Sequence, residues 1–379
     1  MASKVRCKRC LILDRCPHTA INRDGVCNHC EDHLAGKRPG SPHFLPLEEK
    51  QKYADELERI LRTTKGDRDY DCIVGYSGGK DSIYLVHKLK RDYPNLRILA
   101  ATVVMGYAFN DLALKNMEES LAKLDVDHIA IKPRISFYRK FYSYLISHRI
   151  PGGYKRGVYD SKTVTEKNAG LCFYCHEIVH DILLNYAAKH EIPLHLTGGS
   201  PGQPLYWFFA QDEDDIRQPN IPTFMQSAPF DDMDRSYCWD PGRFPGLTTY
   251  PRALFPFHVW EYNAERMREE IYQAGLISSR KNTSMFKTNC KLNFLMVYID
   301  MKIDGYFNML PYLSFLIRSG LADGRKLRAI LFVLENFLMK RKNSAIRQLE
   351  RDLGVDADEI VSKFKSQRGW AAAVCDSPT

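Results

Sequence analysis

The sequence predicts an α/β protein with a parallel, doubly wound sheet, a small cysteine-rich segment before it and a helical region after it. From Asp69 to Thr197, short apolar segments alternate with segments of helical length. Strands spaced by such helices form right-handed βαβ units and a parallel sheet covered on both faces. The first 33 residues are too few for a hydrophobic core of their own, and the chain after residue 259 has helical periodicity. We therefore expect three parts, at residues 1–40, 41–258 and 259–379.

Four strands are expected from short apolar runs, at residues 72–76, 97–104, 128–131 and 192–197. Between and around them, amphipathic spacing predicts helices at 47–64, around 83–86, and at 111–124, 137–147 and 175–190. Further helices are expected at 264–274, 292–301, 310–319 and 326–340. Residues 200–258 are rich in Pro, Gly, Asp and aromatic residues and show no clear period, which is typical of a functional loop, lid or interface.

Length, charge and cysteine content narrow the classes of function. The 379 residues contain no apolar run long enough to span a membrane, and the start lacks the apolar core of a signal peptide, so we expect a cytoplasmic protein. The net charge of +8 favours anionic partners, although no concentrated basic tract indicates a dedicated nucleic-acid binder. Disulfides are rare in the reducing cytoplasm, so the eleven cysteines of this chain indicate metal or redox chemistry more than disulfides.

A glycine-containing hexapeptide follows the first expected strand and precedes a helix. Gly78 and Gly79 let the backbone approach a phosphate without a Cβ in the way, and successive N–H groups form an anion nest next to the helix N-terminus. Ser77 and Ser82 offer hydroxyl donors, and Lys80 offers a positive charge. Asp81 is either a helix-start residue that satisfies backbone N–H groups or a group that positions magnesium or water. The carboxyl end of a parallel strand is where such sheets bind ligands, so the sequence predicts a nucleotide site here.

The hexapeptide Ser77–Ser82 resembles the SGGxDS signature of the PP-loop ATP pyrophosphatases, a superfamily with a HUP-like α/β domain. The resemblance implies cleavage of ATP between the α- and β-phosphates, transfer of AMP to a carbonyl-type oxygen and retention of pyrophosphate by the loop, with Mg²⁺ present. Nitrogen or sulfur then displaces AMP. It also implies that Ala101, Thr102 and Val103 lie near adenosine and that Thr197-Gly198-Gly199 closes the site. Lys80, Asp81 and Ser82 are the expected catalytic residues.

Two CxxC pairs lie near the start of the chain, Cys7 with Cys10 and Cys27 with Cys30. Each pair can place two thiolates on one tetrahedral ion, and the separation suits a zinc ribbon whose folding energy comes from the metal. Other residues could replace one of the four ligands: Cys16, His18, His29 and His33. Such a ribbon is more often a scaffold or docking element than a catalytic one.

The N-terminal segment also has a narrower resemblance. Cys7-Lys-Arg-Cys-Leu, with Asp24-Gly25-Val26-Cys27-Asn28-His29-Cys30 after it, looks like the start of the N-acetyl sugar amidotransferases. The stretches Tyr70–Val74, Asp127–Ile129 and Tyr138–Lys140 continue the likeness over the first half of the chain. It implies conversion of an N-acetyl group of a sugar to an acetamidino group, with ammonia from a separate glutaminase.

A second set of cysteines resembles another branch of the same superfamily. Cys172, Cys175 and the distant Cys290 are similar to the three thiolates that hold a [4Fe–4S] cluster in PP-loop tRNA thiotransferases, with one iron left open to carry sulfur. The other interpretations are zinc on Cys172 and Cys175 with a nearby histidine, or ordinary buried thiols. The chain has Thr197-Gly-Gly-Ser-Pro-Gly-Gln203 where the thiotransferases have TGHNxDD, and the cysteine trio is not typical of the sugar enzymes.

Three functions therefore remain open. The first is adenylation by ATP followed by amidotransfer to an N-acetyl sugar, for example a nucleotide-linked one, with a glutaminase partner. The second is sulfur insertion into tRNA or a small metabolite, with a sulfur donor and an iron–sulfur cluster. The third is a nucleotide-binding scaffold without turnover. The oligomeric state is not predicted.

Overall fold

The computed structural model describes most of the chain. The described residues are 5–16, 18–35, 47–67, 69–150, 170–199, 216–247, 249–283, 290–307, 309–320, 322–338 and 341–375. No helix among them is long and apolar enough to cross a membrane.

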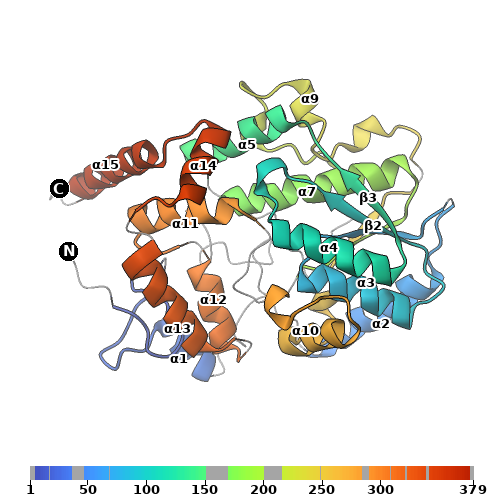
Figure 1. The fold of residues 1–379 in the computed structure, drawn as a ribbon, viewed down its shortest axis with the longest axis horizontal. Helices are drawn as coiled ribbons and strands as arrows, with labels where there is room; N and C mark the ends of the chain where they lie inside the picture. Colours follow the sequence, from blue (N-terminus) through green and yellow to red (C-terminus); the bar gives the residue numbers. More distant parts are fainter. Residues whose placement is uncertain are drawn as a thin grey trace.

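A five-stranded parallel sheet forms the centre of the α/β part of the protein, whose strands β2 and β3 are seen in the right half of Figure 1. Its strands are β1 (Cys72–Gly75), β2 (Ile98–Val103), β3 (Asp127–Ile131), β4 (Leu194–Thr197) and β5 (Arg252–Leu254), in the order β3-β2-β1-β4-β5. All neighbouring pairs are parallel. The α/β class and the parallel, doubly wound sheet predicted from the sequence are confirmed. The first four strands coincide with the expected runs, whereas β5 was not predicted.

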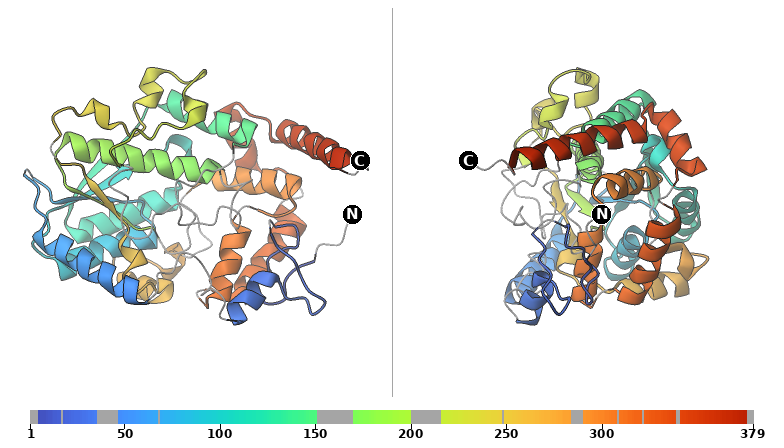
Figure 2. Two further views of the ribbon diagram at one scale, coloured as in Figure 1. Left: turned by 180° about the vertical axis from the view of Figure 1, so that it is seen from behind. Right: turned by 90° about the vertical axis from the view of Figure 1, so that its left-hand side faces the viewer.

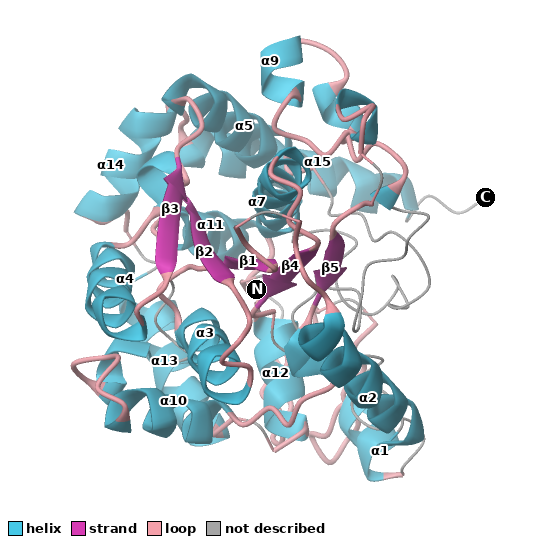
Figure 3. Ribbon diagram, turned by 90° about the vertical axis from the view of Figure 1, so that its right-hand side faces the viewer, coloured by secondary structure: helices cyan, strands magenta, loops and turns pink. Residues whose placement is uncertain are grey.

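Helices cover both faces of the sheet, as Figure 3 shows. Ile73 and Leu99 share one core cluster with α5 (Ile135–His148) and α7 (Gly170–Lys189). Cys72 and Val74 share the other cluster with α2 (Leu47–Thr63), α3 (Lys80–Asp92), α4 (Asp111–Leu124) and α10 (Ala264–Gln273). Because successive residues of a strand point to opposite faces, an apolar run such as 72–75 supplies both clusters.

The missed strand β5 lies inside the 200–258 stretch. It has only three residues, and Pro251 and Pro256 flank it, so its length and composition hid it. The same stretch contains the short helices η2 (Thr223–Met225), α9 (Asp232–Arg235), η3 (Pro241–Arg243) and η4 (Pro256–His258). Residues 200–215 lie outside the described part of the chain. Within this stretch, η2 and α9 lie against α5, where Phe224 stacks on Tyr144 and Arg134 binds Asp231 and Asp234. Trp239 instead packs in one cluster with Ala253 of β5.

The C-terminal helices gather at the end of the molecule that carries the N-terminal segment (Figure 2). They are α11 (Leu292–Ile303), α12 (Leu310–Arg318), α13 (Gly324–Val333) with the π-helical η6 (Leu334–Leu338), α14 (Ser344–Leu353) and α15 (Ala357–Cys375). The N-terminal segment contains one helix, α1 (Asn28–Leu34), and the 3₁₀ helices η1 (Gly106–Ala108) and η5 (Arg280–Thr283) complete the described elements. The three-part division at 40 and 258 stays a prediction.

A buried ion cluster joins the helical region to the sheet layer. Arg149 follows α5 in the left-handed conformation, with φ +47°, and its side chain is 8% exposed. Its guanidinium donates to Asp300 Oδ1 at 2.9 Å and to Asp304 Oδ2 at 3.0 Å, and both carboxylates are essentially inaccessible to solvent. Buried charges of this kind are tolerated in a protein interior when groups of opposite sign are paired and hydrogen-bonded.

Candidate nucleotide site and metal centre

The strand order reverses between β1 and β4, and the glycine-containing hexapeptide lies at that point. The chain passes from β1 to β2 and β3 on one side, and β4 and β5 lie on the other. In open α/β sheets, ligands bind outside the carboxyl ends of the strands at such a reversal. Residues 76–79 leave the end of β1 and lead into α3, whose first N–H groups have no partner within the helix. The loop is therefore in the position that a nucleotide site requires.

Gly78 is packed directly against α4. Its φ is +68°, and a Cβ at this position would lie 2.3 Å from Ala113 O and 2.7 Å from Met117 Cγ. No side chain fits there without displacing the loop or the helix. Buried Asn116 holds the same residue from α4, because its Nδ2 donates to Gly78 O at 3.3 Å and to Asn282 O at 3.4 Å. The loop backbone is thus fixed from one side.

Ser77 and Ser82 close the loop on itself. Ser82 Oγ donates to Gly79 O at 3.1 Å and accepts from Ser77 N at 3.2 Å. The two hydroxyl oxygens are 3.3 Å apart, and Gly79 N donates to Ser77 Oγ at 3.4 Å. Both serines therefore shape the turn between β1 and α3, with short polar groups that can exchange partners.

Lys80 and Asp81 form a compact cluster with Tyr262. Lys80 Nζ lies 2.6 and 2.8 Å from the two carboxylate oxygens of Asp81 and 2.8 Å from Tyr262 Oη. Tyr262 Oη in turn donates to Asp81 Oδ1 at 3.0 Å. The Lys80 side chain is only 9% exposed. The carboxylate of Asp81 is thus engaged with two side chains, and the N-cap residue Gly79 makes no side-chain cap.

Ala101 and Thr102, expected near adenosine, are buried in β2. Tyr76 N donates to Ala101 O at 2.7 Å, and Thr102 Oγ1 donates to Tyr76 O at 2.6 Å. Since the hydroxyl proton of Thr102 points to that carbonyl, His128 Nε2, 2.9 Å away, acts as the donor to Thr102 Oγ1. Ala101 and Thr102 thus fix Tyr76, the residue that precedes the hexapeptide. β2 ends at Val103, so the backbone after Val103 forms the carboxyl edge of the sheet there.

The end of β4 lies against the start of α3. A Cβ on Gly198 would lie 3.1 Å from Asp81 C and 3.1 Å from Ser82 N. Thr197, the last residue of β4, is half-buried and pairs in register with Gly75 of β1. The structure therefore brings Thr197 and Gly198 together with the hexapeptide, on the side opposite α4.

The four cysteines of the two CxxC pairs meet in a buried cluster. The sulfurs of Cys7, Cys10, Cys27 and Cys30 all lie within 4.8 Å of one another. Two separations are 3.8 Å, between Cys7 and Cys30, and 3.5 Å, between Cys10 and Cys27. Cys27 N donates to Cys7 Sγ at 3.3 Å. Neither Cys16 nor any histidine belongs to this cluster among the described residues.

These distances fit one tetrahedral metal ion. With zinc–sulfur bonds of about 2.3 Å, the sulfurs of a tetrahedral site are roughly 3.8 Å apart, which agrees with the separations in the protein. Four buried thiolates with an N–H donor to one sulfur form a closed, structural type of site. The cluster can therefore hold a metal ion, which is compatible with the predicted zinc ribbon.

Cys172, Cys175 and Cys290 do not form a site for a single ion. Among the described residues, their sulfurs are not all within 4.8 Å of one another. They nevertheless share one neighbourhood. Cys175 Sγ contacts Met105 Sδ at 3.8 Å, and Cys290 forms a β-bridge to Phe109, so both lie at the segment that follows β2. Burial raises the pKa of the Cys175 thiol, and the nearby Cys290 and Cys172 raise it further.

Two site residues were not found from the sequence. Tyr262 lies 182 positions beyond Lys80, in a segment with no motif, and only the fold brings the two side chains together. Asn116 is a polar residue on the mostly apolar, buried face of α4. A buried amide needs hydrogen-bond partners, so this exception to the apolar pattern could have indicated that Asn116 holds a neighbouring segment.

The comparisons with known proteins are weak. No protein-family model matches the chain, and no curated protein sequence matches it. Among solved structures, the chain is similar to the NH3-dependent NAD synthetase from Campylobacter jejuni (13% identity, TM-score 0.33), with 80% of this chain and 93% of that chain covered.

Two further solved structures give comparable values. They are an NMN synthetase from Francisella tularensis (10% identity, 78% and 98% coverage, TM-score 0.34) and the U34-tRNA thiolase NcsA from Methanococcus maripaludis with its [4Fe-4S] cluster (14% identity, 80% and 81% coverage, TM-score 0.30). Similarity at this level carries no functional argument, so function is inferred from the site.

Proposed function

We propose that the chain is a PP-loop ATP pyrophosphatase that adenylates an oxygen atom of its substrate and releases pyrophosphate. The observation that carries the proposal is the position of Ser77–Ser82 at the carboxyl end of β1, where the strand order reverses. A positive-φ glycine packed on α4 and a closed serine pair support it, because they give the backbone a fixed concave shape.

In the proposed reaction, a carbonyl-type oxygen of the substrate attacks the α-phosphorus of ATP. The bond from that phosphorus to the α–β bridging oxygen breaks, and pyrophosphate leaves with the bonding electrons. The loop N–H groups and the α3 N-terminus would bind the leaving diphosphate. Lys80 would turn from Asp81 and Tyr262 toward it, and Mg²⁺ bound to ATP would neutralise further charge. These donors lower the barrier because they are already oriented.

In the second half of the reaction, nitrogen replaces the activated oxygen. Ammonia attacks the carbon that carries the adenylated oxygen, and AMP leaves with that oxygen. The acceptor is the N-acetyl group of a sugar, for example a nucleotide-linked one, and a separate glutaminase supplies the ammonia. The resemblance of the N-terminal segment to the sugar amidotransferases supports this assignment, with zinc in the four-cysteine cluster as a structural ion.

Sulfur transfer is the second candidate, and one observation favours it. Cys175 and Cys290 both contact the segment that follows β2, at the edge of the sheet where the nucleotide would lie. A four-iron cluster binds each thiolate through a different iron, so it needs sulfurs further apart than one ion does. Cys172, Cys175 and Cys290 would hold such a cluster, whose open iron would carry sulfide from the sulfur donor. That sulfide would replace the adenylated oxygen of tRNA or a small metabolite, and AMP would leave with the oxygen.

Pyrophosphate release tests the shared first step. Lys80→Met should lower ATP-dependent pyrophosphate release, with an N-acetyl sugar nucleotide as the acceptor probe, by at least about tenfold. Lys88→Met is the matched control, since Lys88 lies on α3 but pairs with Asp92, away from the loop. Equal release by Lys80→Met and the unaltered protein would refute the assignment. ATP binding without pyrophosphate release with any acceptor tried would favour the scaffold.

Metal analysis after anaerobic purification separates the two transfers. Zinc alone, in a colourless protein, supports amidotransfer. A brown protein with iron and acid-labile sulfide, whose colour is lost in Cys290→Ser but retained in Cys238→Ser, supports sulfur transfer. Cys238 is a suitable control because it is buried and belongs to no proposed metal site.

A further inference from the structure

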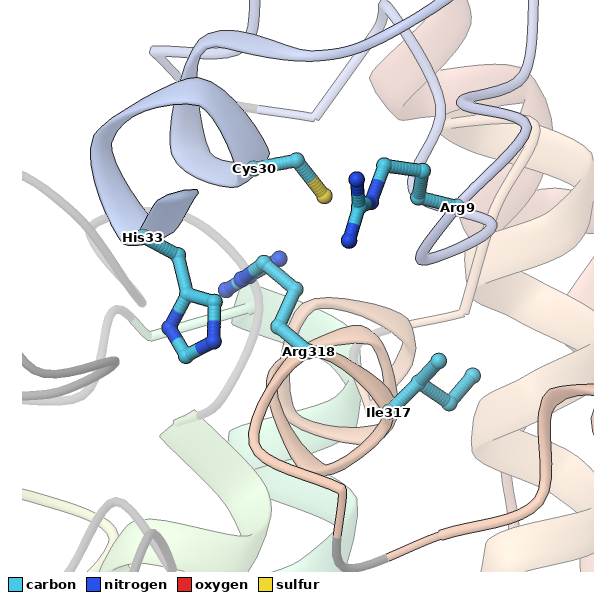
Figure 4. Close-up of a pocket in the computed structure, with 5 residues that line it drawn as sticks. All are labelled: Arg9, Cys30, His33, Ile317 and Arg318. Atoms are coloured by element: carbon cyan, nitrogen blue, oxygen red, sulfur yellow. The ribbon is translucent and has the colours of Figure 1, made fainter. Parts of the chain in front are cut away.

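Two arginines from distant parts of the chain line the cleft beside the four-cysteine cluster. Arg9 lies between the cysteines of the first pair, and Arg318 is the last residue of α12. Figure 4 shows both guanidinium groups turned toward the space beside Cys30, with His33 and Ile317 also lining the cleft. Arg318 Nη1 donates to Cys10 Sγ at 3.4 Å. A residue of the C-terminal helices therefore contacts a candidate metal ligand directly.

The two arginines have no carboxylate at ion-pair distance within the described part of the chain. The ion pairs there involve other arginines, such as Arg6 with Glu335 at 2.6 Å. Two guanidinium groups that face one cleft repel each other unless a negative charge lies between them. Four thiolates around a divalent ion carry a net charge of −4 + 2 = −2. Two arginines carry +2, so a metal-filled cluster would balance them.

Apolar packing and an ion pair also hold the N-terminal segment against the C-terminal helices. The segment between the cysteine pairs buries Leu11 and Leu13, which belong to one core cluster with Leu327 and Leu331 of α13. Arg6 connects the N-terminal segment to the C-terminal helices a second time. Its guanidinium donates to Leu11 O at 2.7 Å within the segment and to Glu335 of η6. The N-terminal segment is thus docked on α12, α13 and η6, with the cysteine cluster at the contact.

We propose that the metal centre acts as a joint between the N-terminal segment and the C-terminal helices. The N-terminal segment supplies the four thiolates, and Arg318, with Arg9, supplies the compensating charge. Metal binding therefore stabilises the docked arrangement, and the docked Arg318 in turn slows metal release. The proposal rests on metal occupancy of the cluster, which elemental analysis of the purified full-length protein measures separately.

Metal release from the full-length protein tests the joint. Zinc transfer to a chromophoric chelator should be about 10–100-fold faster in Arg318→Met than in the unaltered protein, the range typical for residues that support metal ligands. Arg318→Lys, which keeps the charge but loses the planar donor, should fall between the two. Arg325→Met is the control, because Arg325 is 94% exposed on α13 and, among the described residues, its ion pair is with neighbouring Asp323. Circular dichroism checks that each variant is folded.

Amide hydrogen exchange gives a second readout that does not depend on release rates. Chelation of the metal should raise exchange in 310–318 as well as in 7–30, and Arg318→Met should show raised exchange in 310–318 with metal bound. Equal release rates in Arg318→Met and the unaltered protein would overturn the proposal. The proposal would also be overturned if inorganic phosphate stabilised the metal-loaded protein but did not stabilise Arg318→Met. The two arginines would then form an anion-binding site. Absence of any bound metal would instead refute the metal assignment itself.

Discussion

Alanine at position 78 tests the packing of the nucleotide loop. Gly78 has φ +68°, and a Cβ there would lie 2.3 Å from Ala113 O, a backbone atom that cannot rotate away. The left-handed conformation costs an alanine about 1–2 kcal/mol, and forcing extra atoms into a packed contact costs about 1–3 kcal/mol. We expect Gly78→Ala to lower the free energy of unfolding by about 2–5 kcal/mol.

Two other glycines separate these contributions. Gly354 has φ +66° with nothing within 4 Å of the position that a Cβ would take, so Gly354→Ala should show the conformational cost alone, about 1–2 kcal/mol. Gly246 has neither a positive φ nor a neighbour within 4 Å, so Gly246→Ala should leave stability within about 1 kcal/mol of the original. The excess in Gly78→Ala over Gly354→Ala measures the contact with α4.

Chemical denaturation followed by intrinsic fluorescence measures the stabilities, and calorimetric titration with ATP measures binding. Since the loop must leave α4 to admit a methyl group, we expect Gly78→Ala to bind ATP at least about tenfold more weakly, whereas the two control variants retain affinity. The reasoning is wrong if Gly78→Ala is no less stable than Gly354→Ala and binds ATP as the unaltered protein does.

Three further predictions concern Asp71, just before β1, and Asn116 and Tyr262, which contact the loop and Lys80. Burial opposes ionisation of Asp71, but donors from Arg97 and Gly66 outweigh it and lower its pKa from 3.8 to about 2. Its stabilisation, about 2 kcal/mol, is complete above pH 4 and disappears as the pH falls toward 2, so the stability deficit of Asp71→Asn should shrink over that range in denaturation at stepped pH. Asn116→Ala should weaken ATP binding several-fold, with Asn116→Asp no better because a carboxylate cannot donate to Gly78 O; equal ATP affinities in calorimetry would contradict this role. Tyr262→Phe removes a hydroxyl shared by Lys80 and Asp81 and should cost about 1 kcal/mol of stability, measured by denaturation; no change would show that the hydroxyl is dispensable.

The sequence predicted the strands that are long and apolar. Residues 72–75 and 98–103 are buried on both faces, so they appear as continuous apolar runs. β5 has three residues between prolines and gives no such signal. The short spacing of each CxxC pair likewise made the four-cysteine cluster predictable, because local spacing alone brings two thiolates onto one ion.

Contacts that depend on tertiary structure could not be predicted. Tyr262 reaches Lys80, and Arg318 reaches Cys10, across 182 and 308 positions of the chain. No periodicity encodes either pairing, since each depends on how a helix is oriented after the whole protein has folded. The hexapeptide itself is local, and its place at the carboxyl end of the first strand followed from the alternation of strands and helices. The reversal of strand order at that strand came only from the structure.

The ion cluster at Arg149 determines where the chain can be shortened. A protein expressed only through residue 290 would keep this buried cation and lose its buried carboxylate partners Asp300 and Asp304. Stranding a buried charge costs about 3–5 kcal/mol, a large share of the stability of an ordinary domain. Attempts to isolate the sheet for crystallisation or binding studies should therefore retain α11, or replace Arg149 by an apolar residue at the same time.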